Sequence, residues 1–250
     1  MSHGLLPSFG RPSSTPWPKL RAGPPFYPQI HQSSQVLLPT ELRCSSINHS
    51  QESYGSVSPT SAPSPSRFKV KFQTLKGCKL GIGRFPDFEY DATGGSGTAT
   101  GKADGPTDEL TTRFETESLH IPPLTGATTR FLGFPLPPLL EIAIAPEVFE
   151  GTINTRSGKV ELQFRARFLF SIGKLYKAPP LVVETNLTSE ESVGSIRRGR
   201  GERLGREGRC SLVGVAAVEA IDDVFMNFFL SLPTECIANL NAKISIAEAE

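Results

Sequence analysis

The stretch Val160–Ile172 reads VELQFRARFLFSI, and its alternation decides the fold class. Apolar side chains occupy every second position as far as Phe170, and charged or amide side chains fall between them as far as Arg167. A period of two places the two sets of side chains on opposite faces of a β-strand. Residues 148–154 alternate in part, and residues 156–159 (RSGK) have the composition of a turn. The pattern therefore predicts an antiparallel hairpin of two half-buried strands.

Outward from this hairpin, five more segments have strand-like patterns, and the clearest alternates Phe68, Val70 and Phe72 with lysine and glutamine. The predicted strands are 67–75, 181–188, 209–221, 224–232 and 235–246. The segment 235–246 also fits a helix, because Ile237, Leu240 and Ile244 recur at a spacing of three to four residues.

Glycine and proline punctuate these segments, for example at residues 94–97, 104–106, 121–123 and 134–138. Helical stretches of about 10–15 residues between strands, which a parallel α/β fold needs, are absent from the pattern. We therefore expect an all-β (or β-rich α+β) domain over residues 67–250, built as an antiparallel sandwich or barrel and preceded by a disordered N-terminal extension.

The N-terminal segment 1–66 has a different composition from the rest of the 250 residues. It holds 15 serines and 11 prolines, four basic side chains, and only Glu41 and Glu52 as acids. So polar a segment buries too little apolar surface to offset its chain entropy, so we expect it to be disordered. Its serine-rich, basic composition is typical of an organelle transit peptide, and it lacks the apolar core of a secretory signal.

Within this segment, the sequence Leu-Arg-Cys-Ser at 42–45 resembles the processing region of plant plastid precursors. The resemblance implies a plastid transit peptide over residues 1–44, a disordered leader over 45–66, and a location in the chloroplast stroma or on the stromal face of the thylakoid. The body is similar in kind to chloroplast lipid-associated, lipocalin-like proteins, although it carries no motif specific to them.

Catalytic and metal-binding patterns are poor in the body. Its one histidine, His120, lies beside a proline-rich turn, and a histidine-based zinc site needs more ligands. The glycine-rich run 94–102 has the wrong spacing for a phosphate-binding loop, so we expect a mobile hairpin loop there. Cys78, Cys210 and Cys236 lack metal-site spacing, and free thiols are the common case, with a Cys210–Cys236 bridge as the alternative. We therefore expect no catalytic residues, no metal and no cofactor.

Two segments are candidate contact surfaces. The first, 196–209, interleaves six arginines with glycines, and we single out Arg197, Arg198, Arg200 and Arg203. It fits a solvated turn or contact with anionic headgroups better than nucleic acid, because no aromatic residue lies between Tyr176 and Phe225 for base stacking. The net charge of +1 also disfavours nucleic acid.

The second segment, 131–144, is an apolar stretch broken by prolines. It is either a lip over the mouth of a barrel, a surface-docking loop, or a rigid buried connection; its candidate contact residues are Phe131, Phe134, Leu136 and Leu139. No uninterrupted run of about 18 apolar residues exists, so we expect no transmembrane segment.

These observations favour a non-enzymatic plastid protein that binds an apolar or amphipathic ligand, such as a lipid, or a membrane surface. The alternative is an assembly or stability factor for a thylakoid or stromal protein complex, and an enzyme with an unrecognised site is a third class. An open apolar interior would favour the ligand, and a filled core would favour the interaction role.

The targeting hypothesis predicts that residues 1–66, fused to a fluorescent protein, direct it into plastids, because composition alone marks such signals. Fluorescence microscopy of transformed plant cells measures this outcome. Cytosolic or secreted fluorescence would contradict the hypothesis, and the fluorescent protein alone is the control.

Overall fold

The computed structural model describes residues 66–103 and 108–249. Their fold is mostly antiparallel β-sheet with one short helix, as the alternating pattern predicted. The strands are β1 Arg67–Thr74, β2 Cys78–Ile82, β3 Phe88–Tyr90, β4 Ser96–Ala103, β5 Glu109–Phe114, β6 Thr129–Phe131, β7 Phe134–Pro135, β8 Leu140–Asn154, β9 Val160–Ile172, β10 Tyr176–Lys177, β11 Leu181–Thr188, β12 Glu191–Val193, β13 Arg198–Arg200, β14 Arg209–Val218 and β15 Thr234–Glu248, and the helix is α1 Val224–Leu230. The transit peptide, all of the leader except Ser66, and the predicted turn at 104–106 lie outside the described residues.

The predicted hairpin is confirmed and is longer than the sequence pattern indicated. Strands β8 and β9 pair from Leu140–Ile172 at one end to Ile153–Val160 at the other, with an irregularity between Pro146 and Val148. A proline cannot donate to a sheet ladder, so it is tolerated in a strand at such a bulge.

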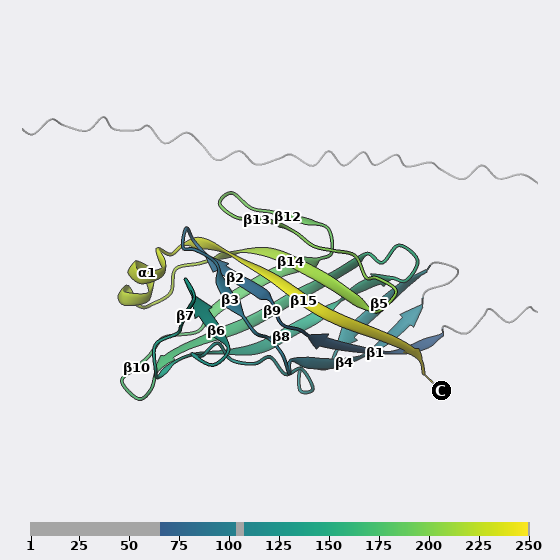
Figure 1. Ribbon diagram of the computed structural model, residues 1–250, viewed down its shortest axis with the longest axis horizontal. Coiled ribbons are helices and arrows are strands. Elements are labelled where there is room, and N and C mark those ends of the chain that lie inside the picture. Colours follow the sequence, from purple (N-terminus) through teal and green to yellow (C-terminus); the bar gives the residue numbers. More distant parts are fainter. Residues whose placement is uncertain (1–65, 104–107, 250) are drawn as a thin grey trace, which may run out of the picture. The chain divides into compact units, whose positions relative to one another are not determined.

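Eight of these strands form a closed ring. Its order is β1-β4-β5-β8-β9-β11-β14-β15, and β15 returns to pair with β1. Every neighbouring pair is antiparallel (Figure 1), and β11 and β14 pair at one position, Thr188 with Val213. A ring of about eight strands has an interior that side chains can just fill. The sandwich-or-barrel expectation therefore resolves to a barrel-like closed sheet.

The ring differs between its two ends because β15 changes partner. Its C-terminal half pairs with β1, whereas Cys236–Asn239 pair with β2. From β2 a second branch runs through β3, β6 and β7. This branch ends at β7, which pairs only with β6 among the described strands, so the sheet does not close onto β8 at this end. We call the β1-β4-β5 side the closed end and the β2-β3-β6-β7 side the open end.

Phenylalanines fill the interior toward the closed end. The rings of Phe72, Phe114 and Phe149 pack with centroids 4.6–6.0 Å apart, and Phe164 packs edge-on against Phe149 at 5.9 Å. Leu162 of β9 and several aliphatic side chains complete this core and are fully buried. Apolar burial of this kind is the main stabilising term of the closed sheet.

The glycine-rich run 94–102 is largely a strand, so the expected mobile loop is wrong from Ser96 onward. A Cβ on Gly97 would come within 2.7 Å of Leu119, and one on Gly101 would come within 2.9 Å of Leu110. The glycines therefore serve close packing inside the ring rather than a flexible turn or a phosphate site.

Residues 224–232 were predicted as a strand, and this is wrong, because α1 occupies Val224–Leu230. The side chain of Asp223 accepts a hydrogen bond from the Met226 N–H at 2.8 Å, which caps the first turn. Met226 and Leu230, four residues apart, are the buried side chains of the helix. A short apolar run is compatible with a helix or a strand, and here the capping hydrogen bond from Asp223 favours the helix. The alternative for residues 235–246 resolves in favour of the strand β15.

No helix in the part of the chain that the structure describes is long and apolar enough to span a membrane.

Candidate ligand-binding cavity

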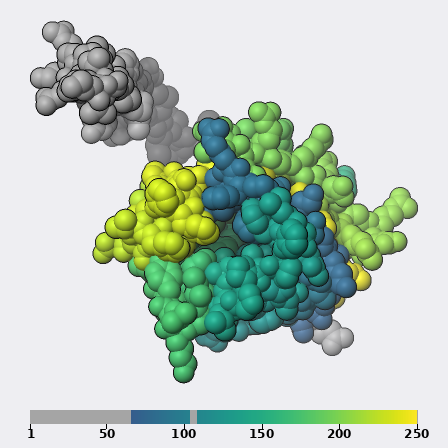
Figure 2. Space-filling view, turned by 60° about the vertical axis from the view of Figure 1, so that its left-hand side comes forward, coloured from purple at the N-terminus to yellow at the C-terminus, as the bar shows by residue number. Residues whose placement is uncertain are grey.

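A cavity of about 560 Å³ lies inside the open end of the closed sheet. Its walls come from β2, β3, β6 to β9, β11, β14, β15 and α1. Figure 2 looks toward this end and shows a hollow between α1 (yellow), the region around β2 and β3 (blue) and the region around β6 and β7 (teal). Small-molecule sites in proteins span about 300–1,000 Å³, so the cavity has the size of a ligand site.

The cavity wall is almost entirely apolar. Among the described residues, no charged side chain lines it, and Thr185 provides the single hydroxyl. That hydroxyl donates a hydrogen bond to the carbonyl of Val215 at 2.8 Å, so it is not free to donate one to a ligand. Burial raises the pKa of the Cys236 thiol to about 11, which keeps it neutral at physiological pH. The cavity thus offers shape and apolar surface, and no charge to pair with a ligand.

The floor of the cavity is the phenylalanine core. Phe164 lines the cavity and also a smaller one of about 70 Å³, which is walled by Phe72 and Phe149. Leu80, Phe168 and Leu240 also border both spaces. Void space therefore continues from the open end toward the core, and the closed end stops it.

Helix α1 forms one side of the mouth. Met226, Phe229 and Leu230 line the cavity, while Phe228 points outward and is 86% exposed. The hydroxyl of Tyr176 donates to Asp223 Oδ2 at 2.7 Å and so ties the helix to β10. The Met226 N–H and then Tyr176 hold the pKa of Asp223 below its usual value. Burial, with the hydrogen bond to Asp223 second, raises the pKa of Tyr176 to about 12.

The apolar candidates of the stretch 131–144 lie at this mouth. Phe131, Phe134 and Leu136 line the cavity, and Leu139 does not. Phe131 stacks on Phe88 with centroids 4.7 Å apart, and Leu136 is buried. Phe134 and Leu139 are 75% and 69% exposed. The segment is therefore partly a buried connection and partly an exposed lip.

The arginine candidates do not share one environment. Strands β12 and β13 form a separate hairpin over the outside of the sheet (Figure 1). Arg198 and Arg200 are exposed on it. Arg203 forms an ion pair with Glu190 at 2.6 Å, which lowers the pKa of that carboxyl. None of these three side chains lines the cavity among the described residues.

Arg197 is bonded to several groups within the protein. Only 16% of its side chain is exposed. Its guanidinium donates to Asp87 Oδ1 at 2.7 Å, to the Gly83 carbonyl at 2.7 Å and to the Phe85 carbonyl. Glu235 accepts hydrogen bonds from the backbone N–H groups of residues 195–197, and these bonds lower its pKa. Arg197 thus fastens the hairpin to the 83–87 turn beside the mouth.

The other chemical candidates are not brought together into a site. Across residues 66–103 and 108–249, no cluster of three or more histidine, cysteine, aspartate or glutamate side chains could hold a metal. Cys78, Cys210 and Cys236 are all free. Cys210 pairs with Ala242 and Cys236 with Ala216 on the β14–β15 ladder, which separates the two thiols by six positions, or about 20 Å. The Cys210–Cys236 bridge is thereby ruled out in this fold.

Sequence reasoning missed most of the wall. Leu80, Ile82 and Gly81 come from β2, which has no alternating pattern, and Met226 and Leu230 come from the helix that was predicted as a strand. The inward positions of β9 and β11 were predictable from alternation. That they face a void rather than a filled core was not.

No protein-family model, curated protein or solved structure matches the chain.

The hydrogen bonds of Arg197 within the protein predict that its replacement lowers the free energy of unfolding. We expect Arg197→Ser to lower the free energy of unfolding by about 1.5–3 kcal/mol, because it removes hydrogen bonds from a charged group to partly buried acceptors. The exposed neighbour Arg198→Ser should change it by less than about 0.5 kcal/mol. Urea unfolding of the two variants measures the difference, and equal midpoints would show that Arg197 does not hold the hairpin.

Proposed function

We propose that the protein binds one apolar molecule, or the hydrocarbon part of an amphipathic one, in the cavity at the open end. The observation that carries this proposal is a volume of about 560 Å³ whose described lining has no charged side chain. Burial of hydrocarbon contributes about 0.8 kcal/mol per methylene, so even a modest chain supplies enough free energy for binding.

The lining also defines the ligand's orientation. Moving a carboxylate or phosphate from water into the cavity would bury its charge with no opposite charge beside it, which costs several kcal/mol of binding free energy. Such a group must therefore stay at the mouth, where Lys174 is exposed on the turn before β10 and Lys177 is exposed on β10. We infer that an amphipathic ligand enters tail first and keeps its headgroup outside the sheet.

We also propose the plastid as the compartment in which this binding takes place. Support comes from the serine-rich, basic composition of residues 1–66 and from the processing-like sequence at 42–45. Plastid membranes are rich in long-chain apolar molecules, which suits the size and polarity of the cavity.

Two adjacent valines of β11 give a matched test of the cavity. Val183 lines it, and Val182 is 44% exposed on the outer face. We expect Val183→Trp to weaken the binding of the neutral dye Nile red by at least about tenfold, because the indole occupies ligand space and overlaps the bound dye. Val182→Trp should leave the affinity unchanged.

Fluorescence titration gives the two dissociation constants, and thermal unfolding checks that both variants are folded. Equal dye affinity of the two folded variants would contradict binding in the cavity.

Competition against Nile red tests the tail-first orientation. Hexadecanoic acid should displace the dye, whereas hexadecanedioic acid should compete at least about a hundredfold more weakly, because a straight chain would bury its second carboxylate. Methyl hexadecanoate, which has no charge, is the length-matched control and should compete. Equal competition by the acid and the diacid would contradict the orientation.

A further inference from the structure

The large apolar side chains that the fold leaves exposed are concentrated at the open end. Of the twelve among the described residues, nine lie on α1, on β7 or on turns around the mouth. We call these nine the rim: Phe85, Leu132, Phe134, Leu139, Leu175, Val224, Phe225, Phe228 and Phe229. The remaining three, Val182, Val193 and Ile196, lie elsewhere on β11 and the β12–β13 hairpin.

The rim is a connected surface rather than a scatter of side chains. Phe229 packs against Phe85 at 6.3 Å and stacks on Phe225 at 5.7 Å, and Phe225 packs edge-on against Tyr176 at 5.4 Å. On the other side, the Gly173 N–H donates to the Leu139 carbonyl, which joins the turn carrying Leu175 to the stretch carrying Leu139. A contiguous exposed apolar patch rimmed by polar residues often marks a site of interaction with a protein or a membrane.

Helix α1 is the densest part of the rim. Its sequence, VFMNFFL, has no charged residue, and its outward side chains Val224 and Phe228 are 87% and 86% exposed. A helix of a water-facing surface normally turns charged or polar residues outward. Apolar and aromatic side chains turned outward are typical of helices that lie in the interfacial layer of a membrane.

The rim is continuous with the cavity. Phe85, Leu132, Phe134 and Phe229 are exposed to the outside and also line the cavity. An apolar path therefore runs from the outer surface into the protein, which is the geometry a ligand needs to leave a hydrocarbon phase without crossing water.

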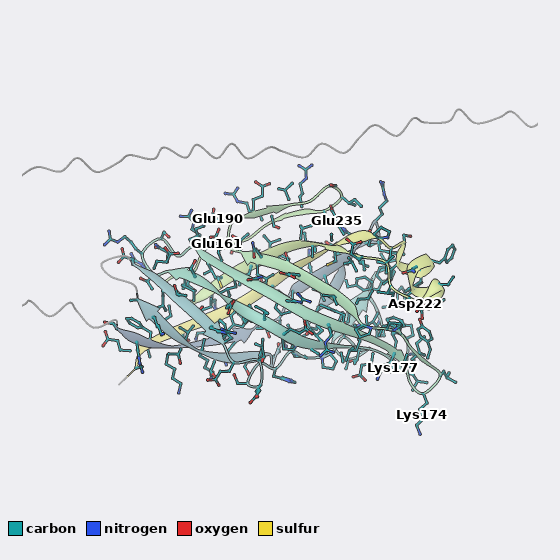
Figure 3. All side chains as sticks on the ribbon, turned by 180° about the vertical axis from the view of Figure 1, so that it is seen from behind. Glu161, Lys174, Lys177, Glu190, Asp222 and Glu235 are labelled. Carbon is teal, nitrogen blue, oxygen red and sulfur yellow. The ribbon has the colours of Figure 1, made fainter. Side chains whose placement is uncertain are left out.

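Charges around the rim favour a bilayer over a second copy of the chain. Arg84, Arg130, Lys174 and Lys177 lie within two residues of rim side chains, and so do Asp87, Glu141, Asp222 and Asp223. Arg197 forms an ion pair with Asp87, so with Arg197 included these groups carry five positive charges against four negative ones, an excess of one. Figure 3 shows Lys174, Lys177 and Asp222 at this one end. A second copy would place this excess against itself, whereas lipid phosphates complement it.

We propose that the open end docks on a lipid bilayer, with the rim inserted into the interfacial layer and the mouth of the cavity facing the membrane. The docking itself depends only on the rim, and the passage of a ligand between bilayer and cavity rests on the proposed function. Apolar insertion supplies most of the binding, and the flanking cations add a preference for anionic lipids.

Flotation with vesicles of phosphatidylcholine containing a minor fraction of phosphatidylglycerol tests the docking. The double variant Leu175→Asp/Phe228→Asp changes two side chains that are 85% and 86% exposed and do not line the cavity. We expect it to partition to vesicles at least about tenfold more weakly than the unaltered full chain. The variant lacks two large apolar side chains whose transfer from water into the interfacial layer favours binding.

The matched control is Val182→Asp/Val193→Asp, which adds the same charge at two exposed apolar positions outside the rim. It should float with the vesicles as the unaltered chain does. Added salt should leave most of the binding in place, because insertion is not screened. Failure of the unaltered chain to float, or equal flotation of the two double variants, would overturn the proposal.

Two further measurements keep the docking separate from ligand binding. The rim variant should still bind Nile red in solution, and the folded Val183→Trp variant should still float with vesicles. Loss of flotation by Val183→Trp would overturn docking through the rim. Sedimentation equilibrium showing a dimer that the rim variant abolishes, without vesicle binding, would assign the rim to a second copy and also overturn it.

Discussion

The strand β15 hydrogen-bonds to β14 along one edge and to two different strands, β1 and β2, along the other. This division of one edge is the constraint on which the rest of the structure depends. A closed ring of about eight strands has an interior that side chains can just fill. Where β15 meets β1, the ring closes through β1, β4 and β5 and phenyl rings fill it; where β15 meets β2, the branch ends at β7 without pairing to β8, and a cavity remains.

The cavity does not collapse because the elements around it are held in place by their own contacts. The packed rings of Phe72, Phe114 and Phe149 form a floor that cannot move up without leaving a void behind it. On the opposite side, α1 is held by the Asp223 cap and by Tyr176, and the 83–87 turn is held by Arg197. The polar contacts of the open end thus hold α1 and the 83–87 turn in place, and the interior offers almost only apolar contacts to a ligand.

The same separation extends to the outer surface. Arginines Arg198 and Arg200 stand on the β12–β13 hairpin, while the outward side chains of α1 and of the neighbouring turns are phenylalanine, leucine and valine. The exposed arginines and the exposed apolar rim are therefore different surfaces. We place the membrane contact on the apolar rim and the cations beside it, because the rim surrounds the mouth through which a ligand would pass, whereas Arg198 and Arg200 do not line the cavity.

The sequence by itself determined the β-rich class, the β8–β9 hairpin and β1, because a period of two is a local property of the chain, and it indicated β11 and β14 through their β-branched residues. It also singled out the apolar stretch 131–144 as a candidate contact surface, of which Phe131, Phe134 and Leu136 line the cavity and Leu139 does not. Local patterns failed at residues 224–230, where one capping carboxylate outweighed strand propensity, and at Arg197, whose acceptors lie more than a hundred residues away. Only the tertiary structure decided that the interior of β9 and β11 is a cavity at one end and a packed core at the other. That outcome depends on which strands share the edge of β15, and pairing between distant strands leaves no periodic signal in either of them.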